Sequence, residues 1–196
     1  MSEWWTYRPS DFLMFSARTW GRLLEAHNRE AWPWQFLLLA IGLAWLWAAL
    51  HHPRVTARWS GIVLAAAWGW VAWAFHWQRH ADINTAAPWL AGAWALQAAL
   101  LLVLGTRPAS TRPPAWQAGA ALGCALAALV AYPLVAPLAG RGWAQAEVAG
   151  LMPEPTALFT LGLLFALPQR HRGLLVVIPV LSLALGWTTA WLLWAR

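Results

Sequence analysis

Residues 115–139 read AWQAGAALGCALAALVAYPLVAPLA, and none of them carries a formal charge. A helix that crosses the hydrocarbon core of a bilayer, about 30 Å thick, needs about 20 consecutive and mostly apolar residues. This stretch is long enough, and it lacks the alternation of apolar and polar residues that is typical of a lipid-facing β-strand. The segment therefore predicts a membrane-spanning helix.

Five further apolar runs lie on either side of this segment, separated by polar or proline-bearing breaks. Because an unsatisfied backbone group in lipid costs several kcal/mol, helices are the structures expected for such runs. The sequence therefore predicts an all-α integral membrane protein that forms a single membrane domain over residues 1–196. Its six transmembrane helices are expected at about residues 33–50, 59–78, 84–105, 115–139, 155–168 and 173–195.

The run at residues 155–168 is shorter than the others. At 1.5 Å per residue its helix would span roughly 21 Å, which is less than a full crossing. Two interpretations stay open. Either the helix extends back through residues 147–152, or the segment 153–155 lies below the membrane surface beside a water-filled cavity, where non-helical backbone is tolerated.

The composition of the whole chain also indicates lipid as its solvent. Hydrophobic residues make up 61% of it and charged residues 10%, whereas soluble domains have about 45–50% and about 25%. Nineteen tryptophans suit the headgroup boundary of a bilayer, which we therefore expect as the partner. The net charge of +6 comes from arginines scattered between the apolar runs. A nucleic acid is not an expected partner, because such binders cluster their arginines on one soluble face.

Before the first run, residues 10–28 (SDFLMFSARTWGRLLEAHN) predict an amphipathic helix. Ser10 is expected to cap its start, with Asp11 in the first turn, where the helix dipole favours an anion. Apolar side chains such as Phe15, Leu23 and Leu24 recur at helical spacing. The pattern predicts an N-terminal helix that lies in the membrane interface. A short helix that covers one end of the bundle fits the same pattern.

Charged residues are unevenly divided between the two sides of the predicted bundle. With six spans, both termini and the second and fourth loops share one side, and all seven acidic residues lie there. The three loops of the opposite side contain arginines and no acid. Because short arginine-bearing loops tend to stay in the cytoplasm, we expect both termini on the outer side of the membrane.

The stretch FHWQRHADIN, residues 75–84, concentrates polar groups at the end of the second span. Its two histidines, His76 and His80, are four residues apart and share one face if the helix continues. Such a pair with nearby carboxylates could ligate a divalent metal or relay protons. A simpler alternative is that polar residues end the helix where it meets water. The candidate polar site on the acid-bearing side comprises His76, His80, Asp82, Asn84, Glu147 and Glu154.

No cofactor is predicted, and a divalent metal at this histidine pair or haem b are the alternatives. Haem b needs two axial ligands from facing helices at matched depth. The sequence offers His51 or His52 with His171, or His76 with His27. In each pair at least one member falls in a loop or at the interface, which argues against haem.

Three segments resemble a family of uncharacterised bacterial inner-membrane proteins, a domain of unknown function. They are the opening with WWTYRPSDFL (residues 4–13), INTAA (residues 83–87) and PEPT (residues 153–156). The family often has proline where this chain has Thr85. The resemblance implies a multi-pass protein of the bacterial inner membrane, whose termini the charge pattern places in the periplasm. It implies no activity.

These observations leave three classes of function. The first is non-enzymatic binding or permeation of a small solute or cation through the polar site, with a homo-oligomer able to build a larger pore. The second is an accessory or structural subunit of a larger membrane complex, for example an electron-transfer complex, with or without haem b. Small residues such as Gly119 and Gly123, spaced as GxxxG, would allow close packing there. An enzyme comes last, because no nucleophile–base motif is visible and no catalytic residue is predicted.

Overall fold

The computed structural model describes residues 13–194 of the chain, and these residues are almost entirely helical. Within this range the only β-structure is two isolated bridges. The all-α class is therefore confirmed. A helix lies over each of the six predicted ranges, namely α2 (Trp34–His51), α3 (Pro53–Trp70), α4 (Ala87–Val103), α5 (Ala115–Leu138), α6 (Pro153–Ala166) and α8 (Val177–Trp194).

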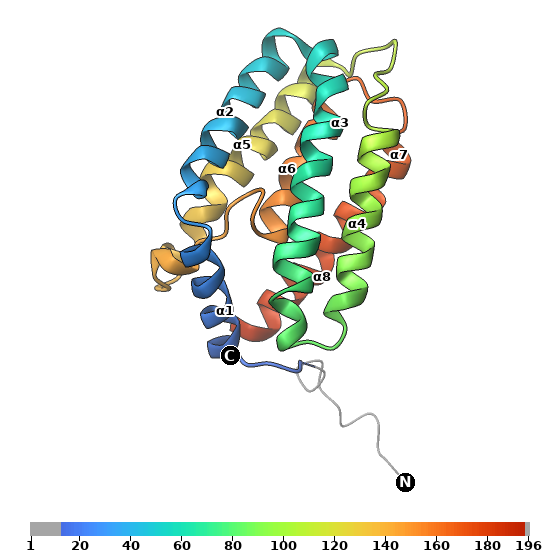
Figure 1. The fold of residues 1–196 in the computed structure, drawn as a ribbon. Coiled ribbons are helices and arrows are strands. Elements are labelled where there is room, and N and C mark those ends of the chain that lie inside the picture. Colours follow the sequence, from blue (N-terminus) through green and yellow to red (C-terminus); the bar gives the residue numbers. More distant parts are fainter. Residues whose placement is uncertain (1–12, 195–196) are drawn as a thin grey trace.

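Successive long helices alternate in direction, so that the bundle has two distinct ends (Figure 1). The upper end in Figure 1 carries the turn between α2 and α3 and the loops at residues 104–114 and 167–171. The lower end carries α1 (Ala17–Glu30), the 3₁₀ turn η4 (His80–Asp82) and the last turns of α8. The short helix α7 (Arg172–Leu175) leads from the upper loops into α8.

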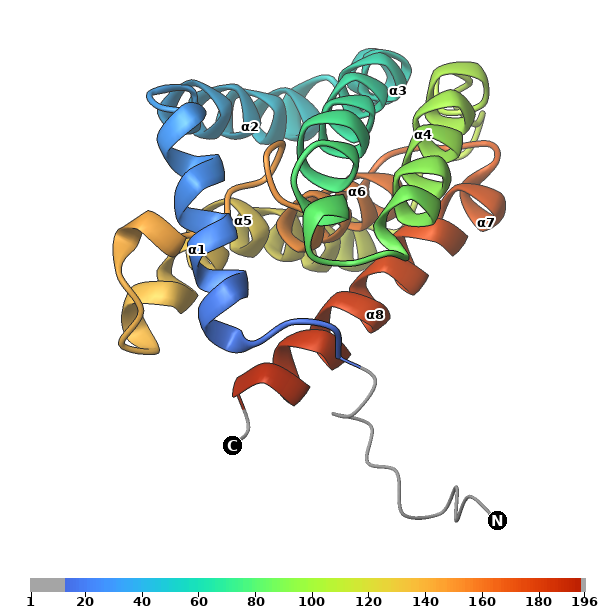
Figure 2. The same ribbon diagram turned by 60° about the horizontal axis from the view of Figure 1, so that its bottom comes forward.

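Helix α6 lies in the middle of the bundle, surrounded by the other long helices (Figure 2). It packs against α5, α8 and α3, and 11 of its 14 residues are buried. A Cβ atom at Gly162 would lie 2.6 Å from the Cβ of Ala125, so this glycine allows α5 and α6 to touch. The helix begins at Pro153 and does not extend back through residues 147–152, which leaves Pro153 and Glu154 buried at its start.

Helix α3 continues without a break into a π-helical segment, η3 (Val71–Trp77). The amide of Gln78 donates to the carbonyl of Trp73, five residues earlier, at 3.0 Å. Together α3 and η3 form one helical rod of about the length predicted for the second span. His76 lies inside η3. Because π-helical turns are rare and are often found at functional sites, this position supports His76 as a candidate site residue.

Helix α1 begins later than the sequence pattern predicted. Its N-cap is Ser16, whose Oγ accepts a hydrogen bond from the amide of Thr19 at 3.2 Å. Phe15, just before the cap, stacks on Trp20, and this contact fixes the direction in which the chain enters the helix. The predicted start at Ser10 is therefore wrong, because residues 13–16 are not helical. Ser10 and Asp11 themselves lie outside the described residues.

The apolar face of α1 packs against the protein. Leu24 is fully buried, and the ring of Trp20 meets that of Phe75 edge-on, with 5.8 Å between centroids. The 3₁₀ turn η5 (Trp143–Gln145), between α5 and α6, packs on α1 as well. In the structure this helix therefore covers one end of the bundle, and its position in the membrane interface stays a prediction.

Three of the described helical segments are long and apolar enough to cross a membrane: Trp34–His51, Ala115–Leu138 and Arg172–Trp194. Helix α4 is apolar but has 17 residues, and α6 has 14. Only 17% of the first candidate span and 22% of the second are buried inside the protein. The number of six transmembrane helices stays a prediction.

Candidate functional site

The two histidines of the predicted polar site face each other. His76 Nδ1 lies 3.3 Å from His80 Nδ1, and His80 Nε2 lies 3.1 Å from the Nδ2 of Asn84. The amide orientation of Asn84 is fixed by its Oδ1, which accepts from the backbone amide of Ala86 at 2.9 Å. These residues come from η3, η4 and the turn that precedes α4.

The direction of these hydrogen bonds determines the state of both rings. Because the Nδ2 of Asn84 only donates, His80 accepts at Nε2 and carries its proton on Nδ1. His80 then donates to His76 Nδ1, which places the proton of His76 on Nε2. His76 Nε2 is buried and has no hydrogen-bond partner among the described residues. The cluster therefore ends in a buried N–H group that can donate.

Burial keeps His80 neutral, as this chain of hydrogen bonds requires. The ring is 5% exposed, and loss of hydration lowers its pKa to about 4. Edge-on contacts with Phe15 and Trp20, at 5.8 and 5.3 Å between centroids, form part of the cover. The histidine pair is thus uncharged near neutral pH.

A second hydrogen-bonded chain links α1 to Arg79, which lies between η3 and η4. Arg79 forms an ion pair with Glu30 and donates through Nε to His27 Nδ1 at 2.7 Å. His27 Nε2 in turn donates to the carbonyl of Leu151 at 3.2 Å. Burial, followed by the charge of Arg79, lowers the pKa of His27 to about 4. The pKa of Glu30 is lowered by its hydrogen bond to Arg79.

Glu154 lies in the first turn of α6 and is 8% exposed. Its Oε2 is buried and has no hydrogen-bond partner within residues 13–194. A Cβ atom at Gly186 of α8 would lie 2.7 Å from the carboxyl carbon of Glu154, so a glycine is needed there to leave room for the side chain. Glu154 also lines two adjoining cavities, which share Trp20, Gly186 and Thr189 as well.

The first of these, which we call the histidine cavity, has a volume of about 280 Å³. Its polar lining includes His76, His80, Asn84 and Glu154. Four aromatic rings complete much of the wall, those of Phe15, Trp20, Phe75 and Trp94. The cavity thus combines one carboxyl group and two neutral histidines with several aromatic rings.

The second, which we call the glutamate cavity, has a volume of about 500 Å³ and includes Glu147, Tyr132 and Arg141 in its lining. Arg141 Nη1 lies 3.9 Å from Glu147 Oε1, and its guanidinium group stacks over the ring of Trp194. Burial and then the nearby charge of Glu154 raise the pKa of Glu147, while Arg141 opposes this shift.

The structure brings most of the predicted site residues together. Four of them line the histidine cavity, and Glu147 lies in the glutamate cavity next to it. Asp82 is exposed and lines neither cavity, because the turn η4 directs it to the surface. Sequence reasoning missed Arg141 and Gly186. An isolated glycine inside an apolar run, such as Gly186, is the only signal that pointed to a close approach there.

Neither of the metal-based alternatives gains a complete ligand set from this geometry. No group of three or more His, Cys, Asp or Glu side chains is placed to hold a metal ion within the described part of the chain. The haem pair of His76 with His27 meets a further obstacle, because both nitrogens of His27 are already hydrogen-bonded. His51 and His52 are exposed at the upper end.

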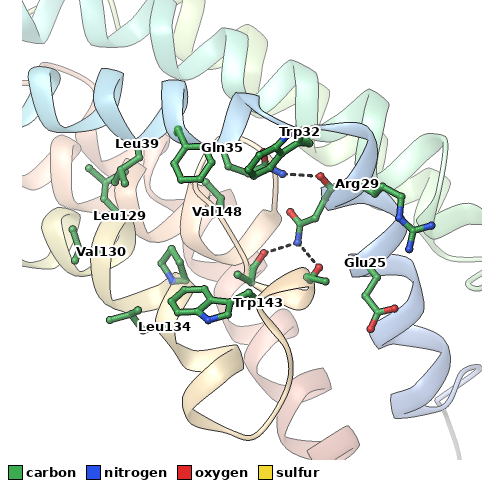
Figure 3. A pocket seen from close by; sticks show the side chains of 15 residues that line it. Glu25, Arg29, Trp32, Gln35, Leu39, Leu129, Val130, Leu134, Trp143 and Val148 are labelled. Carbon is green, nitrogen blue, oxygen red and sulfur yellow. Dashed lines mark hydrogen bonds between the residues drawn. The ribbon is translucent and has the colours of Figure 1, made fainter.

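A further cavity lies apart from the predicted polar site, between α1, α2, α5 and residues 143–148 (Figure 3). Its volume is about 780 Å³. Leu39, Leu129 and Val130 line one end, and Glu25 and Arg29 lie at the other (Figure 3). The lining is mainly apolar, and none of the six predicted site residues belongs to its described part.

Comparison with known proteins gives one match. Residues 18–195 match the model of a family of unknown function, DUF6064. Neither the curated proteins nor the solved structures contain a match to the chain. The match covers the helices described above except for Ala17, the first residue of α1.

Proposed function

The chain belongs to the DUF6064 family of unknown function, and we propose that it is a membrane protein that binds a small cationic solute in the histidine cavity. The role we infer is binding without chemical conversion. Glu154 would hold the positive charge of the solute, and the aromatic wall would surround it.

Insertion in a membrane is supported by the distribution of apolar surface. Exposed tryptophans lie near helix ends, for example Trp34 at the start of α2 and Trp89 and Trp116 at the starts of α4 and α5. Tryptophan prefers the membrane–water interface, so these rings fit a bilayer whose core is crossed by all six long segments.

The proposed location is the bacterial inner membrane, with the lower end of the bundle toward the periplasm. The loops of the upper end contain the acid-free group of arginines, and such loops tend to remain in the cytoplasm. Alkaline phosphatase is active only outside the cytoplasm, so we expect a fusion of this enzyme to the C-terminus to be active. An inactive fusion would indicate the opposite orientation.

The observation that carries the binding function is the buried carboxyl group of Glu154. A polar group buried without a partner is costly, and most such groups in native proteins have one. Oε2 of Glu154 has no partner among the described residues, and the Glu154 side chain lines the histidine cavity. A ligand that donates hydrogen bonds or carries a positive charge would satisfy it.

The rest of the lining also suits a cation. The two cavities together hold two carboxyl groups and one arginine, and the histidines of the pair are neutral. Aromatic faces attract cations through their quadrupoles, and the effect is strongest where water is excluded. Trp20, Trp94 and Phe75 are among the residues that line the histidine cavity.

Binding of propylamine, which is protonated at neutral pH, tests this function by calorimetry on the purified protein in lipid nanodiscs. We expect Glu154→Gln to weaken binding about tenfold or more, because a charge-assisted hydrogen bond is lost. The matched control is Asp82→Asn, which removes an exposed acid at the same end and should leave affinity unchanged. Equal affinity of the Glu154→Gln and wild-type proteins would exclude the proposal.

A further inference from the structure

We propose that the solute is an amino alcohol or amino ether, whose ammonium group is held by Glu154 and whose oxygen accepts a hydrogen bond from His76 Nε2. This inference rests on the proposed function, since it names the class of cation that the histidine cavity takes. It follows from a pair of buried polar atoms of opposite kind in one cavity.

The two atoms have complementary hydrogen-bonding roles. Oε2 of Glu154 can accept, and Nε2–H of His76 can donate, yet neither has a partner among the described residues. Both side chains are more than nine-tenths buried, at 8% and 4% exposure, and both line the histidine cavity. A single ligand with a donor at one end and an acceptor at the other would satisfy both.

The role of His76 as a donor is set by groups outside the cavity. The backbone amide of Ala86 orients Asn84, which fixes the proton of His80 and through it that of His76. A simple alkylammonium ion would satisfy Glu154 and leave this donor unpaired. A bare metal ion would meet a protonated nitrogen at this position.

The charge balance selects a neutral oxygen over a carboxylate. The two cavities hold the carboxyl groups of Glu154 and Glu147, and the only cationic side chain that residues 13–194 contribute to their lining, Arg141, is already near Glu147. The carboxylate of an amino acid would face these acids with only one neutral donor to hold it. A hydroxyl or ether oxygen avoids that repulsion.

The size and lining of the cavity suit a small, partly apolar molecule. Its volume is about 280 Å³, and Leu90, Trp94 and Ile178 offer apolar surface between the polar groups. A two-carbon bridge between nitrogen and oxygen could pack there.

The test compares ligands of equal shape on the wild-type protein in lipid nanodiscs. Calorimetry would measure 2-methoxyethylamine against butylamine, and ethanolamine against propylamine, since each pair exchanges one oxygen for a carbon. We expect the oxygen-bearing member to bind about tenfold tighter, because the carbon analogue leaves the donor of His76 unpaired. Glycine should bind more weakly than ethanolamine.

The variant His76→Phe keeps an aromatic ring and removes the donor. We expect it to lose the preference for oxygen, so that ethanolamine and propylamine bind to it with equal affinity. If that variant does not fold, the ligand pairs on the wild-type protein decide alone.

The outcomes separate this inference from the proposed function. Equal binding within both pairs, with loss of all binding in Glu154→Gln, would overturn the amino alcohol and leave a cation site. Tighter binding of glycine, or zinc binding that His76→Phe abolishes, would also overturn it. Failure of every amine to bind the wild-type protein would overturn both.

Discussion

Two helix ends that each carry a pair of histidines have opposite environments in this protein. His51 and His52 lie at the end of α2, at the upper end of the bundle. His76 and His80 lie in η3 and η4, which follow α3 at the lower end. The first two side chains are exposed. The second two are 4% and 5% exposed and form a hydrogen-bonded chain. The same residue type thus meets water at one end and a cavity at the other.

The difference arises from segments that are remote in the sequence. At the lower end the start of α1 covers the histidine pair, because Phe15 and Trp20 both contact the ring of His80. At the upper end the connecting loops bond to each other, through Ala109 and Pro168, and leave His51 and His52 uncovered. A helix end becomes a site only where another part of the chain covers it.

The largest effect is expected for removal of that cover. Trp20→Ala should reduce stability by about 3–5 kcal/mol, as for other large aromatic residues lost from a core. Trp20 is 8% exposed, whereas Trp47, which stacks on His51 at the upper end, is 59% exposed. Trp47→Ala should therefore change stability little. Thermal unfolding of both variants in the same detergent provides the comparison.

Chemical modification of histidine sharpens the same comparison. Diethyl pyrocarbonate reacts with neutral, accessible imidazole rings, so His51 and His52 should react first in the wild-type protein. Trp20→Ala should make His80 reactive as well. Protection of His80 in that variant, or fast reaction in the wild type, would show that α1 is not what separates the two ends.

An intermediate effect is expected from pH, through His27. Folded His27 takes up its proton near pH 4, whereas an unfolded histidine does so near 6.5. Between these values the unfolded chain binds more protons, so stability falls as pH falls, by about 1.4 kcal/mol per unit for one such group. The loss begins near pH 6.5 and is complete near pH 4.

Melting temperatures between pH 7.5 and 5 measure this slope. His27→Gln should remove the share of the slope that His27 contributes and leave the share of His80, whose pKa is also lowered to about 4. Glutamine can still accept from Arg79 and donate to Leu151 but does not titrate. The matched variant at the other end, His51→Gln, should keep the slope of the wild type. An unchanged slope in His27→Gln would mean that other groups govern the acid sensitivity.

The helices of this fold could be predicted from the sequence because their signals are local. Apolar runs place them, and prolines at the first helical positions of α3 and α6 mark where they begin. The predicted start of α1 was wrong because serine is an equally good N-cap residue at position 10 and at position 16. Only the stacking of Phe15 on Trp20 distinguishes them, and that contact belongs to the folded chain.

Long-range contacts explain what the sequence did not reveal. Gly119 and Gly123 have the spacing of a packing motif, yet no atom lies within 4 Å of a Cβ built at either one. The close contact is made instead by Gly162, which has no partner at that spacing. The histidine pair was visible from its spacing of four. The cavity next to it, and the exposure of Asp82, depend on α6 and η4.

The smallest effect is expected at the rim of the lower end, for Glu30→Gln. Glu30 is 66% exposed, and exposed ion pairs contribute little to stability. Its partner Arg79 would keep the hydrogen bond to His27, so the buried chain should survive. We expect a melting temperature within about 2 °C of the wild type. Arg79→Gln should lower it further, because it also removes the donor to a buried ring. If Glu30→Gln were as damaging as Trp20→Ala, the lower end would depend on surface charge rather than on its cover of aromatic side chains.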